Sequence, residues 1–224
     1  MKWNGLPILI FGSGGIAKEV YHIIEQINNY NNVKVYDFLG FVEDSETKIG
    51  IEVISGYKVI LSDSNICKYA ENFLTLGVVI PNGNPKIKSI IYNKINSIEN
   101  LVYPNIIHPN VTFDSRTVSF GYGNVLAGGS TLTCEIKIGN FNLINMNSTI
   151  GHDTKIGDFN VVNPLTAISG SVCIKDFCLL GTGTQILQEI TINKNAIVGA
   201  GAVVVKDVEE FTTVVGVPAK TIKS

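Results

Sequence analysis

The stretch from 150 to 162 reads Ile150-Gly151-His152-Asp153-Thr154-Lys155-Ile156-Gly157-Asp158-Phe159-Asn160-Val161-Val162, with a bulky apolar residue at every sixth position. The same rhythm continues outward in both directions, through Phe120, Leu126, Leu132, Ile138, Ile144, Ile150, Ile156, Val162, Ile168, Ile174, Leu180, Ile186, Ile192, Val198 and Val204. A period of six matches neither the 3.6 residues of a helical turn nor the two-residue alternation of a strand. It predicts a short strand, a corner and another short strand, repeated along the chain.

The repeat has a second inward position, four residues after each apolar one, where most residues are small or apolar. These residues are Asn142, Ser148, Thr154, Asn160, Thr166, Val172, Cys178, Thr184, Ile190, Ala196, Ala202 and Val208. Together the two positions predict a parallel β-helix, in which three hexapeptides form one triangular coil of about 18 residues. Because coils stack at the strand spacing of about 4.8 Å, side chains 18 residues apart should lie one above another.

One corner of this prism holds residues suited to chemistry. His152 and Asp153 follow the inward Ile150, and steps of 18 residues give a column of Cys134, His152, Gly170 and Gln188. A carboxylate beside an imidazole can fix its tautomer and prepare it as a general base. Gly170 offers a backbone N–H one strand spacing away, where it can stabilise an oxyanion during acyl transfer.

Two other interpretations of this corner stay open. The histidine and the aspartate can form an ordinary solvated turn with no role in catalysis. Alternatively, the Cys134 thiol can form a covalent acyl-enzyme with His152 as its base.

The first hundred residues lack the six-residue rhythm and follow a different pattern. Leu6–Phe11 reads as a short buried strand, Gly12-Ser13-Gly14-Gly15 as a turn, and the spacing of apolar residues from Ala17 to Ile27 as a helix. A glycine turn between a strand and a helix N-terminus presents unpaired backbone N–H groups and a positive dipole to an anion. The turn therefore predicts a phosphate site, with a dinucleotide, a mononucleotide or nucleotide sugar, and a purely structural turn as the alternatives.

Polar residues follow two further strands of this part. Glu43 and Asp44 come after Phe41-Val42, and Asn82 follows the strand Leu76–Ile80. Carboxyl ends of parallel strands meet at one edge of a sheet, where a carboxylate can bind a ribose or a base. We therefore expect an α/β, Rossmann-like nucleotide-sugar-binding domain over residues 1–103 and the β-helix over residues 104–224, ending in a short tail.

Composition narrows the function further. The formal net charge is −2 and Arg116 is the only arginine, which argues against a nucleic-acid surface. No run of eighteen apolar residues and no signal sequence is visible, so we expect a cytoplasmic protein without a membrane segment. The four cysteines are expected to be reduced, and the three histidines are too scattered to predict a metal site.

The motifs resemble the NeuD/PglD-type sugar acetyltransferases of the hexapeptide-repeat acyltransferase superfamily. The resemblance is carried by Phe11-Gly12-Ser13-Gly14-Gly15, Gly40-Phe41-Val42-Glu43-Asp44, the stretch 150–159, the stretch 198–204 and Gly216-Val217-Pro218-Ala219-Lys220. It implies a left-handed winding of the β-helix, a homotrimer with active sites at subunit interfaces, and acetyl-coenzyme A as co-substrate without a metal. The activity it implies is N-acetylation of a nucleotide-linked amino sugar.

The resemblance also implies roles for individual residues. His152 would be the general base, Asp153 its partner and Asn145 a polar group of the active site. The coenzyme would contact Gly170, Gly181, Ala200, Lys206 and Lys220. The nucleotide sugar would contact Gly12, Ser13, Gly14, Glu43, Asp44 and Asn82.

Two departures from the family pattern bear on the substrate. Ile16 and Val161 stand where family members often carry histidine. The first departure affects the expected pose of the substrate, and the second affects the acyl group or the acceptor. O-acetylation of a free sugar such as a sialic acid remains an alternative, and so does a non-catalytic scaffold that binds nucleotides.

Overall fold

A computed structural model describes residues 4–31, 33–54 and 56–222 of the chain. The described chain divides into two compact units. One takes in the residues up to Gly83 together with Ile87–Pro109, and the other takes in Asn84–Lys86 and the chain from Asn110 onward. None of the described helices is long and apolar enough to cross a membrane.

The first unit contains a six-stranded sheet in the order β3-β4-β2-β1-β5-β6. All neighbours pair in parallel except β3 with β4. The strands are β1 (Leu6–Phe11), β2 (Tyr36–Glu43), β3 (Glu52–Ile54), β4 (Tyr57–Ser62), β5 (Leu76–Val79) and β6 (Leu101–Val102). The helices are α1 (Gly15–Asn31), η1 (Glu46–Lys48), η2 (Asp63–Asn65), α2 (Ile66–Ala70) and α3 (Pro85–Ile95), and β7 (Ile106–Ile107) lies against α1.

Burial explains why the first strand is continuously apolar. Ile8, Leu9 and Ile10 of β1 are all 0% exposed, as expected for a parallel strand covered on both faces. The buried residues of α1 recur at helical spacing, including Val20, Ile24 and Ile27. Since β4, β2, β1 and β5 are neighbours and parallel, the loops that follow them gather at one edge of the sheet.

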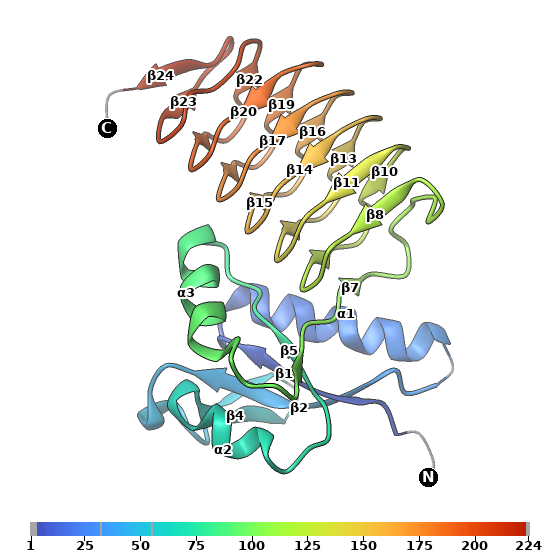
Figure 1. Cartoon of the computed structure of the whole chain (residues 1–224), viewed down its shortest axis with the longest axis vertical. Helices are drawn as coiled ribbons and strands as arrows, with labels where there is room; N and C mark the ends of the chain where they lie inside the picture. The colour runs from blue at the N-terminus through green and yellow to red at the C-terminus, as the bar shows by residue number, and fades with distance from the viewer. Residues whose placement is uncertain (1–3, 32, 55, 223–224) are drawn as a thin grey trace. The chain divides into compact units, whose positions relative to one another are not determined.

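The second unit is a parallel β-helix with three sheets of stacked short strands (Figure 1). One sheet contains β10 (Thr131–Leu132), β13 (Thr149–Ile150), β16 (Ala167–Ile168), β19 (Gln185–Ile186) and β22 (Val203–Val204). A second contains β8 (Val118–Phe120), β11 (Ile136–Ile138), β14 (Lys155–Ile156), β17 (Cys173–Ile174) and β20 (Thr191–Ile192). The third runs through β9 (Val125–Leu126), β12 (Leu143–Ile144), β15 (Val161–Val162), β18 (Leu179–Leu180), β21 (Ile197–Val198), β23 (Thr213–Val215) and β24 (Lys220–Ile222).

The register between coils is 18 residues. Thr149 pairs with Ala167 and Ile150 with Ile168, and the same offset recurs in the other two sheets. Both predicted inward positions are buried: Ile150 is 1% exposed, while Ser148 and Thr154 are 0% exposed. The predicted prism and its vertical columns are therefore confirmed.

Buried asparagines join successive coils through their side chains. Asn142 N–H donates to Asn124 Oδ1 at 2.9 Å, Asn160 N–H donates to Asn142 Oδ1 at 2.9 Å, and Cys178 N–H donates to Asn160 Oδ1 at 2.7 Å. Phe141, Phe159 and Phe177 stack along the same corner with centroids 5.1 and 5.2 Å apart. The amide column satisfies buried backbone groups at a corner where the strands themselves do not reach.

Replacing Asn142 with alanine should destabilise the β-helix. The change removes the acceptor of the Asn160 N–H and the donor to Gly157 O, and a buried group left unsatisfied costs about 1 to 3 kcal/mol. A lower midpoint of thermal or denaturant unfolding is expected. Exposed Ser119, changed to alanine, is the control, and an equal effect of the two changes would contradict the role given to the asparagine column.

Candidate functional sites

The corner that follows β13 holds the predicted His152 column. Ser171 N–H donates to His152 O at 2.7 Å, Asp153 N–H to Cys134 O at 3.1 Å, and Glu189 N–H to Gly170 O at 3.0 Å. These bonds connect each corner residue to the coil above or below it. The structure therefore brings His152 and Gly170 together on one edge of the prism, as predicted from their separation of 18 residues.

His152 and Asp153 form a hydrogen-bonded pair. Nδ1 of the imidazole lies 2.7 Å from Oδ2 of the aspartate, and the two side chains are 62% and 60% exposed. Asp153 has φ of +59°, a left-handed conformation that turns the chain sharply at the corner. A carboxylate that accepts the Nδ1 proton leaves Nε2 as the acceptor, which is the tautomer that a general base needs.

Gly170 lies directly against the imidazole ring. A β-carbon added at Gly170 would lie 2.5 Å from His152 Nε2 and 2.6 Å from Cε1, closer than real side-chain carbons approach. The Gly170 N–H has no hydrogen-bond partner among the described residues. Because residue 170 has no side chain, the imidazole ring can lie against its backbone.

The other residues expected near the coenzyme lie on two different edges. Lys206 is exposed in the same corner column as His152 and Gly170, three coils above the histidine. Asn145 and Gly181 follow β12 and β18, so they share a separate edge of the prism, and Ala200 stacks on Gly181. Asn145 is 7% exposed and accepts a bond from Met146 N–H at 2.8 Å. Within one chain these residues are not brought to the imidazole.

Lys220 belongs to the last hairpin of the β-helix. It opens β24, which pairs antiparallel with β23, and it is exposed. Ala219 N–H donates to Val203 O at 2.8 Å, so the residue before Lys220 lies beside β22, whose following corner carries Lys206. Both lysines expected to contact the coenzyme, Lys206 and Lys220, therefore occur at the C-terminal end of the prism.

The carboxyl edge of the α/β sheet contains a pocket of about 460 Å³. All of the residues predicted to bind the nucleotide sugar line it: Gly12, Ser13, Gly14, Glu43, Asp44 and Asn82. Gly12 has φ of +94°, where an L side chain would be strained, and its N–H donates to Val42 O at 2.7 Å. The glycine turn is thus tied to β2 at the point where the carboxylates begin.

A network of polar side chains fixes the carboxylates of this pocket. The Ser13 hydroxyl donates to Glu43 Oε1, and Lys48 Nζ lies 2.9 Å from Glu43 Oε2 and 2.9 Å from Asp44 Oδ1. Burial opposes the charge of Glu43, but the bonds from Ser13 and Lys48 outweigh it and lower the pKa of Glu43. The Lys48 bonds also lower the pKa of Asp44, so both carboxylates are charged acceptors near neutral pH.

Several residues of the pocket were not predicted from the sequence. Asp63 and Lys94 line it, as do Ile87, Ile90 and Ile91 of α3. In the sequence these isoleucines show only the spacing of a helix. Asp63 directly follows β4, as Glu43 and Asp44 stand at the end of β2, so its place after a strand is the sequence signal that points to it.

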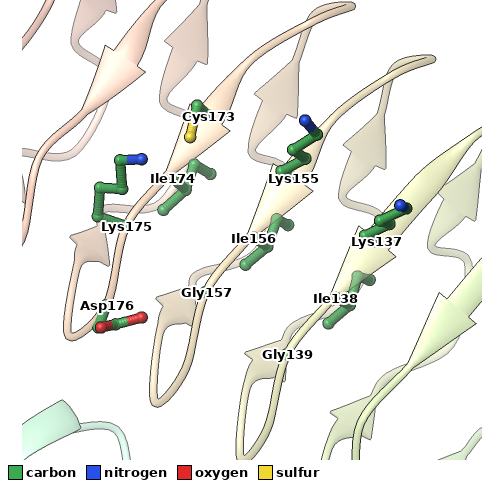
Figure 2. Close-up of a pocket in the computed structure, with 10 residues that line it drawn as sticks. All are labelled: Lys137, Ile138, Gly139, Lys155, Ile156, Gly157, Cys173, Ile174, Lys175 and Asp176. Carbon is green, nitrogen blue, oxygen red and sulfur yellow. The ribbon is translucent and has the colours of Figure 1, made fainter.

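A second hollow, of about 370 Å³, lies on the outer face of the sheet formed by β11, β14 and β17. Figure 2 shows the lysine side chains of Lys137 and Lys155 and the thiol of Cys173 along this face. None of the predicted site residues lines it. Among the described residues, no group of three or more His, Cys, Asp or Glu side chains is arranged to hold a metal ion.

Solved structures of similar fold cover nearly the whole chain. PerB from Caulobacter crescentus, in complex with CoA and GDP-perosamine, is 24% identical over 97% of this chain and 97% of that one, with a TM-score of 0.86. The acetyltransferase domain of PglB from Neisseria gonorrhoeae, in complex with acetyl coenzyme A, is 23% identical over 97% and 100%, with a TM-score of 0.83. WeeI from Acinetobacter baumannii is 28% identical over 97% and 100%, with a TM-score of 0.82.

These likenesses confirm the expected fold class, an α/β domain followed by a β-helix of the hexapeptide type. Within that class, residues 7–95 match the family described as the PglD N-terminal domain. The resemblance to PglD-type proteins is therefore confirmed for the α/β part of the chain. No curated protein sequence matches this chain significantly.

Replacing Lys48 with methionine should raise the pKa of Glu43, because burial then acts with one fewer compensating bond. The folded-state pKa of Glu43 lies below its ordinary value of 4.5, so the bonds stabilise the fold above that pH and the benefit disappears as the pH falls through the folded pKa. Carboxyl NMR titration measures the shift. Lys34→Met, which removes the exposed pair with Asp37, is the control, and an unchanged Glu43 pKa in Lys48→Met would contradict this assignment.

Proposed function

We propose that the protein transfers the acetyl group of acetyl-coenzyme A to the amine of a nucleotide-linked amino sugar. One observation carries the proposal: His152 Nδ1 is held by Asp153 while Nε2 lies against Gly170, whose N–H has no partner among the described residues. The pocket at the carboxyl edge of the sheet, with its glycine turn and charged carboxylates, supports a nucleotide-linked acceptor over a free sugar. PerB, which binds CoA and GDP-perosamine, and PglB, which binds acetyl coenzyme A, support the donor and the acceptor class.

The proposed transfer is direct. The amine nitrogen attacks the thioester carbonyl, His152 Nε2 accepts the proton from nitrogen, and the Gly170 N–H donates to the oxyanion of the tetrahedral intermediate. Collapse of the intermediate breaks the carbon–sulfur bond, and the imidazolium returns the proton to the coenzyme A thiolate. Asp153 stabilises the imidazolium between the two steps.

We also propose that the active centre is completed by a second copy of the chain, in a homotrimer. Gly170 and Lys206 lie on the His152 edge, whereas Asn145, Gly181 and Ala200 lie on another edge of the same prism. One coenzyme can contact both sets when the His152 edge of one subunit faces the Asn145 edge of its neighbour. Acetyl-coenzyme A and nucleotide sugars are cytoplasmic metabolites, so the proposal places the reaction in the cytoplasm.

His152→Ala should lower turnover by about 10² to 10⁴ if the imidazole is the base. Release of the coenzyme A thiol, measured with a panel of nucleotide-linked amino sugars, gives the rate. Cys134→Ala should retain the rate, because the direct mechanism uses no thiol of the protein. Lys155→Ala, which changes an exposed residue of β14 in the same coil, is the control. Near-normal turnover of His152→Ala would refute the assignment, and loss of turnover in Cys134→Ala would favour the acyl-enzyme route.

Mixed assemblies of His152→Ala and Asn145→Ala should recover activity that neither variant has alone. In such a mixture, some interfaces combine His152 from one subunit with Asn145 from its neighbour. Co-expression with two different affinity tags isolates the mixed species, and the mass in solution gives the number of subunits. If the mixed assemblies are as inactive as the two parents, the two residues do not meet across an interface.

A further inference from the structure

Asp63 and Lys94 form an ion pair at one end of the nucleotide pocket. Lys94 Nζ lies 2.6 Å from Asp63 Oδ2, and the aspartate side chain is only 10% exposed while the lysine is 55% exposed. Asp63 Oδ1 has no hydrogen-bond partner among the described residues. A nearly buried carboxylate with an unused oxygen, in the lining of a pocket and beside an ammonium group, is suited to binding a polar ligand edge.

The strand order places this pair at a defined distance from the phosphate site. Asp63 follows β4, Glu43 is the last residue of β2, and Asp44 comes directly after it. The glycine turn follows β1, and the three strands are arranged in the order β4-β2-β1. Two strand spacings separate the ends of β1 and β4, about 10 Å. A nucleotide whose phosphates lie on the glycine turn and whose ribose meets the β2 carboxylates would therefore reach Asp63 with its base.

One wall of the pocket is suited to the flat face of a base. Ile87, Ile90 and Ile91 of α3 line the pocket and share a helix face because they are three and four residues apart. Ile87 is 43% exposed and Ile90 is 61% exposed, which leaves apolar surface open on that face. Apolar walls with a few convergent polar groups are typical of small-molecule sites.

We propose that the Asp63 and Lys94 pair reads the base of the nucleotide, and that the base is guanine. The proposal rests on the nucleotide-linked acceptor proposed above. Lys94 can only donate and the ionised Asp63 can only accept, so the pair presents one donor followed by two acceptors. The edge of guanine presents the complement: the O6 acceptor, then the N1–H donor, then the N2–H donor.

Other bases match this pattern less well. Uracil and thymine match the first two positions, but their O2 oxygen would face the second carboxylate oxygen. Cytosine has a ring nitrogen acceptor in the middle position, opposite a carboxylate oxygen, whichever way its edge is turned. Adenine has no donor or acceptor at the third position. Bidentate contacts of this kind discriminate between bases by about 1 to 3 kcal/mol, which is about 5- to 150-fold in affinity.

Calorimetric titration of the full chain with GDP, IDP, UDP, CDP and ADP tests the proposal. GDP should bind most tightly, and IDP, which lacks only the N2 amino group, should bind about 5-fold or more weakly than GDP. If UDP, CDP, ADP or IDP binds as tightly as GDP, guanine recognition is wrong and the proposed acetyl transfer stands. If no nucleoside diphosphate binds while thioester is consumed with a free amino sugar, the nucleotide-linked acceptor itself is wrong.

Asp63→Asn connects the preference to this pair. The amide replaces one acceptor with a donor, so the advantage of GDP over IDP should disappear while both still bind through the glycine turn. Lys94→Met should weaken GDP and IDP equally, because both carry O6. Asp37→Asn breaks a similar lysine pair on the far half of β2 and is the control. With unfolding midpoints matched to the unchanged protein, an unaltered GDP to IDP ratio in Asp63→Asn overturns the proposal.

Discussion

The 18-residue register between coils is the constraint on which the rest of the β-helix depends. Each coil donates its backbone bonds to the coil beside it, so a residue at a corner is fixed by the residues 18 before and 18 after it. This register places the Gly170 backbone against the His152 ring and aligns Asn124, Asn142 and Asn160 in one buried column. A slip by one residue would turn the inward apolar positions outward, so the same burial that stabilises the prism also fixes the site.

Much of this unit is readable from the sequence because its contacts are periodic. The inward residues repeat every six positions, and the corner column repeats every 18, so simple addition finds that Gly170 neighbours His152. The same arithmetic also separates the edges: Asn145 and Gly181 differ by 36, two full coils, whereas Asn145 and His152 differ by seven. A role for Asn145 beside His152 therefore requires another copy of the chain, which the sequence of one chain does not display.

The pocket at the carboxyl edge of the α/β sheet could be predicted only in part from the sequence, because its contacts join segments with no common period. The glycine turn and the residues after β2 and β5 follow recognisable strands, and they do line one pocket. Asp63 and Lys94 are 31 residues apart and meet only because β4 lies next to β2 and α3 reaches the end of β4. Strand order is set by the packing of the whole sheet, so a local sequence pattern does not predict that Asp63 and Lys94 form a pair.

The exposure of His152 limits how strongly one prism edge on its own can stabilise the proposed intermediate. The His152 side chain is 62% exposed, and Asp153 holds its tautomer through the bond to Nδ1. The same exposure leaves any oxyanion at Gly170 in contact with water, where one hydrogen bond stabilises it only weakly. Preorganised donors act strongly in a site from which water is excluded. In the proposed transfer, a single prism edge therefore supplies the base and the donor, and a second surface must exclude water from them before the transfer can be fast.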